Sequence, residues 1–514
     1  DRPTIARRRR AVSLLHGVTT MPKFPPLRAA GLALVAAAGH AFAFEPAATP
    51  PVPAPADAPP AAVQPAADAR AAAHAEFRKA YEARDYATAV EQARRVVELT
   101  ERAPATSPDE LQVALMNLAA VQRLADDYLS AEATYRRVIE LIETSGRLTR
   151  PRLARAYAGL AITYHAAGRQ DLAADAFEHA IALNRRSEGL FNEEQLPLLA
   201  KYGDALTGLG RVEEALLAHR YALRVVDRRH GERSLAYARE LESLGRWYTR
   251  VGSYEASRTT LRQAAELTTS IEGADAGALV GPLTAYAENA RRWLLDPQWR
   301  EPASIDEARR SMFHDQSMLP PPSLSSSTIA AEGLKALEAA ARIVDADPDA
   351  SPALVAGVHL QLGDWELARR QPERAMPQYH RAWAAAGTDA DGERLRQSLF
   401  GAPVLIRYLV PDNWDRYARR PAEEVERRNV EIELTVTAAG IAADARVLAD
   451  AGDERLAAQA MKALETAVYR PRLADGTAVA TEGVRFVQPF YVLREAATPV
   501  AEPTPPKPRP QGSG

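Results

Sequence analysis

The residues of this chain that could carry out chemistry are scattered, and no familiar catalytic spacing connects them. The 514 residues include ten histidines and no cysteine, which excludes thiol catalysis and zinc bound by cysteine. There is no Gly-x-x-x-x-Gly-Lys phosphate loop, no Gly-x-Ser-x-Gly nucleophile turn, no His-Glu-x-x-His zinc helix and no Gly-x-Gly-x-x-Gly loop after a strand. The sequence therefore predicts a protein that is not an enzyme and holds no cofactor.

The nearest approach to a metal site is the acidic run Asp-Ala-Asp-Pro-Asp at residues 345–349. A calcium loop needs glycine at its sixth position and an acidic residue at its twelfth, where this chain has Ala350 and Ala356. The run is better interpreted as a helix that ends at a proline. His165 and His219 lack helix-face spacing for a shared metal, and His219 occupies a predicted core position. We predict no metal site.

The sequence contains an internal repeat of 42 residues. This repeat predicts the helices that would position any functional side chain. Its clearest markers are small residues at equal spacing: Ala89, Ala131, Ala173, Ala215 and Ser257. Around them, large and small apolar residues recur in two helix-length segments separated by a turn, so each unit is predicted to be a helical hairpin. One hairpin cannot bury its apolar face alone. The units should therefore stack into a solenoid whose concave surface suits extended partners.

The residues around these markers resemble the tetratricopeptide repeat. One unit supplies Tyr157, Leu160, Ala161, Tyr164, Gly168, Phe177 and Ala180, and the next supplies Leu199, Tyr202, Gly203, Leu206, Gly210, His219 and Ala222. The period is longer than the usual ~34 residues and is similar to the kinesin-light-chain variety. The first unit matches only in part, because Phe77 stands where a small residue is expected.

The resemblance indicates which side chains face the concave groove, namely those one, five and eight places after the bulky residue that opens each first helix. The candidate partner-binding residues are Met116, Arg123, Ile162, His165, Asp204, Glu242 and Arg246. The alternative is a solvated concave face that binds nothing, since charged inward residues also keep a solenoid soluble.

The N-terminal region carries a compartment signal. Residues 21–43 combine Lys23 and Arg28 with a short apolar run and an Ala-Phe-Ala ending, which predicts a secretory signal peptide cleaved after Ala43 and a periplasmic protein. Residues 1–20 precede the only plausible start and are interpreted as an over-extended gene start. Without cleavage, the same segment would anchor the chain in the inner membrane.

Composition divides the rest of the chain into segments. These are a Pro/Ala-rich linker at 44–69, a helical repeat solenoid at 70–296, a linker at 297–327, further helical repeats at 328–390, an α+β domain at 403–495 and a disordered Pro-rich tail at 496–514. After the second linker, Ala336, Ala340 and Ile343 are typical of the second helix of a repeat that has lost its first helix.

From about residue 403 the periodicity changes from helical to alternating. Val430, Ile432, Leu434 and Val436 alternate with polar residues, which predicts a strand with one wet face. A turn and a second, weaker strand at 441–448 follow. Asp453 then offers an N-cap to an amphipathic helix, and a third strand contains residues 484–492. The expected order is strand, strand, helix, strand.

This segment, from about Ala422 to Val492, resembles the C-terminal domain of the TonB energy transducers. The resemblance rests on the strand at 430–436, on the Tyr-Arg-Pro at 469–471 and on the Asp-Gly turn that follows. It implies a small α+β unit that pairs an exposed sheet edge with a short peptide of an outer-membrane receptor. Pro489 should interrupt the last strand by removing a ladder donor.

Two functions follow from this mostly α chain with its small α+β domain. The first is a periplasmic scaffold or adaptor whose solenoid holds one envelope protein or peptide while the α+β domain docks on another, which could be an outer-membrane receptor. The second is a TonB-like energy transducer for outer-membrane transport, anchored by an uncleaved N-terminus. An exposed edge could also form a homodimer. The net charge of −3 predicts no nucleic-acid partner.

Overall fold

The computed structural model describes residues 64–103, 107–144, 150–296, 325–411, 424–450 and 452–494. The predicted signal peptide, its cleavage at Ala43, most of the first linker, nearly all of the second linker and the C-terminal tail lie outside the described residues. The chain divides into two compact units, Asp1–Leu362 and Gly363–Gly514.

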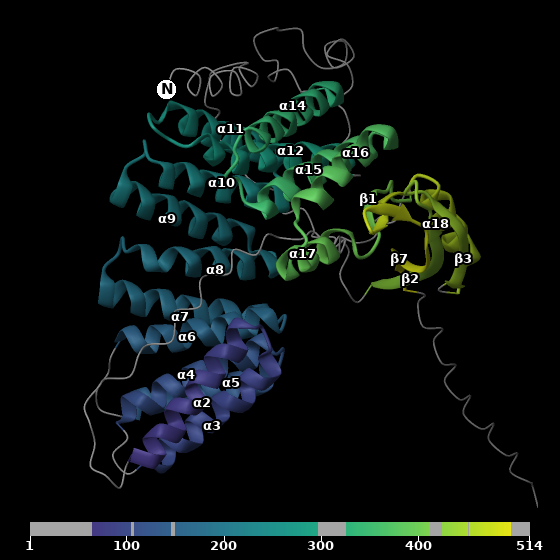
Figure 1. The fold of residues 1–514 in the computed structure, drawn as a ribbon. Helices are drawn as coiled ribbons and strands as arrows, with labels where there is room; N and C mark the ends of the chain where they lie inside the picture. Colours follow the sequence, from purple (N-terminus) through teal and green to yellow (C-terminus); the bar gives the residue numbers. More distant parts are fainter. Residues whose placement is uncertain are drawn as a thin grey trace, which may run out of the picture. The chain divides into compact units, whose positions relative to one another are not determined.

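The first unit is built of helices that follow one another as antiparallel hairpins (Figure 1). They are α2 (Gln64–Glu82), α3 (Tyr86–Arg102), α4 (Pro108–Leu124), α5 (Tyr128–Thr144), α6 (Arg150–Ala166), α7 (Gln170–Glu188), α8 (Leu196–Gly208), α9 (Val212–His230), α10 (Leu235–Arg250), α11 (Tyr254–Ser270), α12 (Val280–Leu295), α14 (Ser326–Asp345) and the first part of α15 (Pro352–Ala368). From α2 to α12 each helix packs on the next, and α12 packs on α14, so the predicted α-solenoid is confirmed.

The small residues that define the repeat lie where helices touch most closely. All five markers, from Ala89 to Ser257, are fully buried, and each is the fourth residue of the second helix of its hairpin. Glycines on the facing first helices are equally constrained. A Cβ added at Gly245 would lie 2.5 Å from Leu261 Cγ, and one added at Gly203 would lie 2.8 Å from His219 Nε2. The 42-residue period therefore marks the positions at which two helices pack most closely.

Replacing Gly245 by Ala should destabilise the solenoid, although alanine favours helix over glycine by about 1 kcal/mol. The added methyl overlaps Leu261 within a fully packed core, and overpacking of this kind costs about 1–3 kcal/mol. Gly208→Ala is the matched control, because its nearest neighbour is the flexible side chain of Gln170 at 3.1 Å. Urea unfolding followed by circular dichroism should show a lower midpoint for G245A than for G208A. Equal midpoints would contradict the close packing.

The expectation that the helix after the second linker has lost its partner is wrong. That helix, α14, packs along α12, so the two form one hairpin. Glu332 on α14 accepts a hydrogen bond from the Tyr286 hydroxyl on α12 at 2.6 Å and pairs with Arg258 on α11 at 3.0 Å. Residues 296–325 separate the two helices in sequence, and this insertion breaks the 42-residue period from which a hairpin could be recognised.

The second unit begins with the end of α15 and continues with α16 (Pro372–Ala385) and α17 (Ala390–Phe400). The remaining elements are β1 (Val404–Arg407), β2 (Val425–Val436), β3 (Ala442–Ala449), α18 (Glu454–Leu464), β4 (Val468–Arg470), β5 (Arg472–Ala474), β6 (Thr477–Val479) and β7 (Thr481–Leu493). The main sheet is antiparallel with the order β3-β2-β7, while β1 pairs with β4 and β5 with β6. The predicted order of two strands, a helix and a strand is confirmed, with four short strands added.

The local predictions for this unit also hold. Val430, Ile432, Leu434 and Val436 are at most 1% exposed, so they form the buried face of β2. The Asp453 side chain accepts a hydrogen bond from the backbone N–H of Arg455 and caps α18.

Candidate interaction surfaces

The apolar candidates of the groove belong partly to the core. Met116 on α4 and Ile162 on α6 are half-buried and pack against the core of the first unit. They could contribute a floor to a groove, because part of each side chain remains accessible.

The charged and polar candidates are each engaged by a neighbour within the first unit. Asp204 pairs with Arg250 at 2.6 Å, and Glu242 pairs with Arg246 at 2.9 Å. Arg246 also donates to the Gly281 carbonyl at 3.2 Å.

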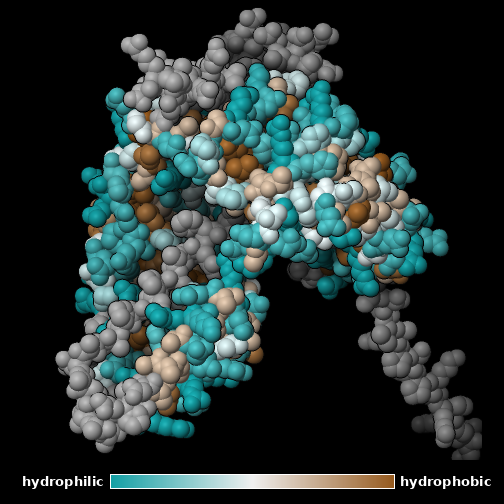
Figure 2. Space-filling view, in the orientation of Figure 1, coloured by the Kyte–Doolittle hydropathy of each residue, from teal (hydrophilic) through white to brown (hydrophobic). Residues whose placement is uncertain are grey.

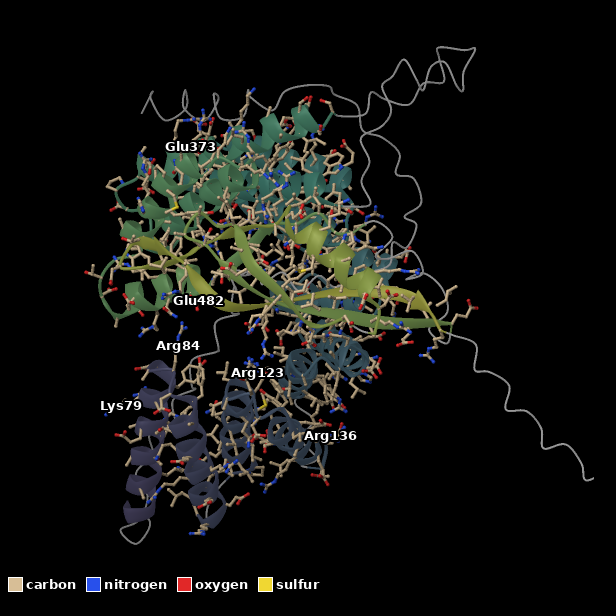
Figure 3. All side chains as sticks on the ribbon, turned by 90° about the vertical axis from the view of Figure 1, so that its right-hand side faces the viewer. Lys79, Arg84, Arg123, Arg136, Glu373 and Glu482 are labelled. Atoms are coloured by element: carbon tan, nitrogen blue, oxygen red, sulfur yellow. The ribbon has the colours of Figure 1, made fainter. Side chains whose placement is uncertain are left out.

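The eighth-place candidates have partners as well. The ring Nδ1 of His165 lies 2.8 Å from Gln170 Oε1. Burial raises the pKa of the Tyr135 hydroxyl to about 12, and the positive charge of the neighbouring Arg123, labelled in Figure 3, opposes this shift. Apart from the pair of Glu242 with Arg246, the structure therefore brings the candidates to local partners rather than to one another, and a ligand would have to compete for them.

Sequence reasoning missed a buried charge cluster beside these positions. Glu132 on α5 is 9% exposed and pairs with Arg136 at 2.8 Å and with Arg169 at 2.6 Å. The Tyr164 hydroxyl donates to the same carboxylate at 3.1 Å. The only sequence signal was the spacing of four between Glu132 and Arg136.

A second missed feature is an exposed aromatic and apolar surface on α9 and the loop before α8. The ring of Phe191 stacks on that of Tyr221 with centroids 6.4 Å apart, and the Arg185 guanidinium lies 4.1 Å from the Tyr221 centroid. Leu190 and Leu217 are both 61% exposed. The face of the first unit that Figure 2 shows is mostly hydrophilic, with small groups of hydrophobic residues between the hydrophilic ones. Exposed aromatic and apolar residues of this kind often mark protein-binding sites.

In the second unit, the outer edge of β7 is not paired with any described strand. Arg494 N–H donates to the Glu424 carbonyl at 2.9 Å, which sets the alternation of the β2–β7 ladder. By this alternation the even-numbered residues of β7 from Val484 onward bond to β2, and the odd-numbered residues direct their N–H and C=O groups outward.

Pro489 is therefore not an interruption of the strand, and the expectation that it would remove a ladder donor is wrong. The β2–β7 register continues through its pairing with Asn429. This is a non-hydrogen-bonded pair, so the missing N–H belongs to the outer edge. The opposite edge of the sheet is less regular, because the register of β3 shifts twice along β2.

Two family models match parts of this chain. Residues 110–186 match the tetratricopeptide repeat, and residues 416–487 match the Gram-negative bacterial TonB protein C-terminal domain. The chain thus contains tetratricopeptide repeats followed by a TonB C-terminal domain. The first match covers α4 to α7, and the second covers β2 and most of β7. No curated protein matches the chain.

Several solved structures are similar to the tetratricopeptide part. A Podosopora anserina putative kinesin light chain with nearly identical TPR-like repeats is 17% identical, with 38% of this chain and 93% of that chain covered and a TM-score of 0.35. BtubC from P. vanneervenii is 21% identical, with 46% and 95% covered and a TM-score of 0.34. A tetratricopeptide repeat protein from Parabacteroides merdae is 13% identical, with 65% and 98% covered and a TM-score of 0.34.

A buried ion pair ties the TonB C-terminal domain to the helices of its own unit. Arg470 is 4% exposed, and its Nη1 lies 3.0 Å from both carboxylate oxygens of Asp364, at the end of α15. The hydroxyl of Tyr379 on α16 donates to the same carboxylate at 2.9 Å. Phe400, fully buried at the end of α17, has its ring centroid 5.9 Å from the Arg470 guanidinium. The domain and these helices therefore share one core.

Over the part of the chain that the structure describes, no cluster of three histidine, aspartate or glutamate side chains could hold a metal ion. None of the described helices combines the length and the apolar character that crossing a bilayer requires.

Proposed function

We propose that this chain is a non-enzymatic scaffold or adaptor of the Gram-negative periplasm. Its tetratricopeptide solenoid holds one envelope protein, and its TonB C-terminal domain binds an extended peptide of another by β-augmentation. The outer edge of β7, which no described strand pairs with, carries the proposal, because the outward-directed backbone groups of a sheet edge are what an added strand recognises.

The solenoid supports a binding role over a catalytic one. Tetratricopeptide repeats are protein-interaction modules, and the charged residues of the predicted groove are engaged in local pairs rather than converging on a reaction centre. The half-buried Met116 and Ile162 and the exposed Phe191 and Leu217 offer separate apolar contacts for a partner.

Two features support the proposed periplasmic location: the match to the TonB C-terminal domain and the predicted signal peptide at 21–43. The peptide of an outer-membrane receptor is a fitting partner for the sheet edge. Energy transduction would need an inner-membrane anchor, and cleavage after Ala43 would remove the apolar segment at 21–43 that could serve as one.

Expression from Met21 in a Gram-negative host tests the location directly. Because the segment before Ala43 has the length and ending of a cleaved signal, we expect a soluble periplasmic protein whose first residue is Phe44. Edman sequencing and membrane fractionation give the answer. An intact N-terminus in the membrane pellet would overturn the adaptor and favour the energy transducer.

A further inference from the structure

We propose that the exposed surface on α9 and the loop before α8 binds an acidic segment of another protein that also carries apolar side chains. We call it the α9 surface, and its residues are Leu190, Phe191, Leu217, Tyr221, Arg185 and Arg224. They lie on second helices and on the loop between two hairpins, whereas the predicted groove residues lie on first helices. The inference rests on the proposed scaffold function and adds a binding site and the chemistry of its partner.

The repeats provide an internal comparison for α9, because their second helices begin 42 residues apart, at positions 86, 128, 170, 212 and 254. On α3, α5, α7 and α11, the counterparts of Leu217 are polar or small: Glu91, Ala133, Asp175 and Thr259. The counterparts of Tyr221 are all polar: Arg95, Arg137, His179 and Gln263. The repeat fold therefore does not require apolar residues at these two positions of α9.

The loop before α8 differs from the next such loop in the same way. Gly189 and Gly231 each end a helix with a positive φ, of 93° and 78°, so the two loops begin alike. After Gly189 come Leu190 and Phe191, whereas after Gly231 come a glutamate and an arginine. An exposed apolar pair thus stands where the next loop has a charged pair.

Hydrogen bonds hold these apolar side chains at the surface. The Leu190 carbonyl accepts a hydrogen bond from the Tyr221 hydroxyl at 2.5 Å and another from Gln195 Nε2 at 2.6 Å. Gln195 is fully buried, so it ties the loop to the interior of the first unit. The ring of Phe191 stacks on that of Tyr221. A partner would meet a surface that is already ordered, which lowers the entropy cost of binding.

Arginines make the α9 surface positive where other repeats are acidic. The guanidiniums of Arg185 and Arg224 lie 4.1 and 5.5 Å from the centroid of the Tyr221 ring. Three counterparts of Arg224 are glutamates: Glu98, Glu140 and Glu266. The counterparts of Arg185 in the two neighbouring repeats are acidic as well: Glu143 and Asp227.

The described residues supply no carboxylate that forms an ion pair with Arg185 or Arg224. Glu193 lies in the same loop, but it is engaged by Arg229. A partner that carries carboxylates beside apolar side chains would satisfy both the charges and the rings of the α9 surface.

A lipid membrane and a second copy of the chain fit this surface less well. Insertion into a bilayer requires apolar side chains that are separated from charges, whereas the Arg185 guanidinium covers the Tyr221 ring and would enter the hydrocarbon with it. A symmetric contact between two copies would place the arginines of one α9 surface against those of the other. The charge therefore favours an acidic segment of a different protein.

The test selects phage-displayed random twelve-residue peptides on the chain from Phe44 to Gly514, which contains all the described residues. Fluorescence anisotropy then measures the affinity of each selected peptide for this chain and for its variants. We expect a group of peptides that combine acidic residues with Leu, Phe or Trp and whose binding depends on the α9 surface.

Exchanges between repeats supply the variants. Leu217→Asp and Arg224→Glu introduce residues that α7 and α11 carry at these positions, and each should weaken binding about tenfold, which corresponds to about 1.4 kcal/mol. Leu129→Asp and Arg95→Glu are the matched controls and should leave the affinity unchanged, because both side chains are exposed but lie outside the α9 surface. Arg224→Glu should also favour peptides in which Lys replaces an acidic residue. An unchanged urea midpoint is the folding control.

Two results of the peptide selection would overturn the inference. If no selected peptide loses affinity for Leu217→Asp or Arg224→Glu, the α9 surface is not a binding site, while the β-augmentation role of the other unit can still stand. If the peptides that depend on this surface are neutral or basic, the acidic partner chemistry is wrong.

Other occupants of the surface would overturn the inference as well. A dimer in analytical ultracentrifugation that Leu217→Asp dissociates would identify a second copy. Cosedimentation with vesicles of phosphatidylethanolamine and phosphatidylglycerol that Arg224→Glu abolishes would identify a membrane. Peptide binding that appears only when the chain starts at Gln64 would identify the preceding segment of the same chain.

Discussion

The Arg470→Ala variant should lose about 3–5 kcal/mol of stability in the second unit, because it leaves the carboxylate of Asp364 without its cationic partner. Asp364 has 14% of its side chain exposed, so water can replace little of the lost interaction. The remaining hydrogen bond from Tyr379 does not neutralise the charge. The packing of the guanidinium on Phe400 would be lost as well.

Urea titration of the whole chain, with hydrogen exchange of peptides from β2 and β4 as the readout, measures this loss in the relevant unit. Arg446→Ala is the matched control. It breaks the ion pair with Glu433 in the same unit, but the Arg446 side chain is 70% exposed, so the expected cost is below about 1 kcal/mol. Similar losses of unfolding free energy for R470A and R446A would show that the buried ion pair stabilises the unit no more than the exposed one.

The same ion pair predicts how the unit can be divided. A fragment of residues 403–495 lacks Asp364, Tyr379 and Phe400, and so Arg470 loses both its counter-charge and the side chains that bury it. A fragment that starts at Pro352 keeps all three. We expect the longer fragment to unfold cooperatively at a higher urea concentration. A shorter fragment of equal stability would contradict a shared core.

The second large effect concerns acid. His219 on α9 is 2% exposed, its Nε2 has no hydrogen-bond partner among the described residues, and its ring centroid lies 4.9 Å from that of Trp247. Burial, together with the nearby Arg250, lowers the pKa of His219 to about 4, although Asp204 opposes the shift.

The sign of the pH effect follows from this lowered pKa. Between the ordinary pKa near 6.5 and the folded value near 4, the unfolded chain binds a proton that the folded chain does not. Stability should therefore fall as the pH decreases through this window, by about 3 kcal/mol for this group alone. Above pH 7 the contribution is fully present.

A His219→Leu variant isolates this contribution, because leucine fills a similar volume and does not titrate. Urea midpoints at pH 7 and pH 4 should differ less for the variant than for the unmodified chain, while carboxylates that titrate in the same range affect both chains equally. An unchanged pH dependence in H219L would show that the buried ring does not control acid stability.

Much of the fold could be predicted from the sequence because its signals are local. The 42-residue spacing of Ala89, Ala131 and their successors identified the helix contacts, since a small side chain is required wherever two helices approach closely. The alternation around Ile432 identified the buried face of β2 for the same reason: a side chain's position along the strand determines the face on which it lies.

The tertiary structure decided what depends on pairing between distant residues. The pairing of α12 with α14, the contact between Asp364 and Arg470 and the outward orientation of Pro489 all depend on which segments meet and in which register. The groove residues show the same limit: the repeat placed Asp204 and Glu242 on the first helices, but only the folded chain showed that arginines already pair with them. The periodicity of a sequence predicts whether a side chain is buried or exposed. A hydrogen bond or an ion pair also requires a particular partner residue, which periodicity does not predict.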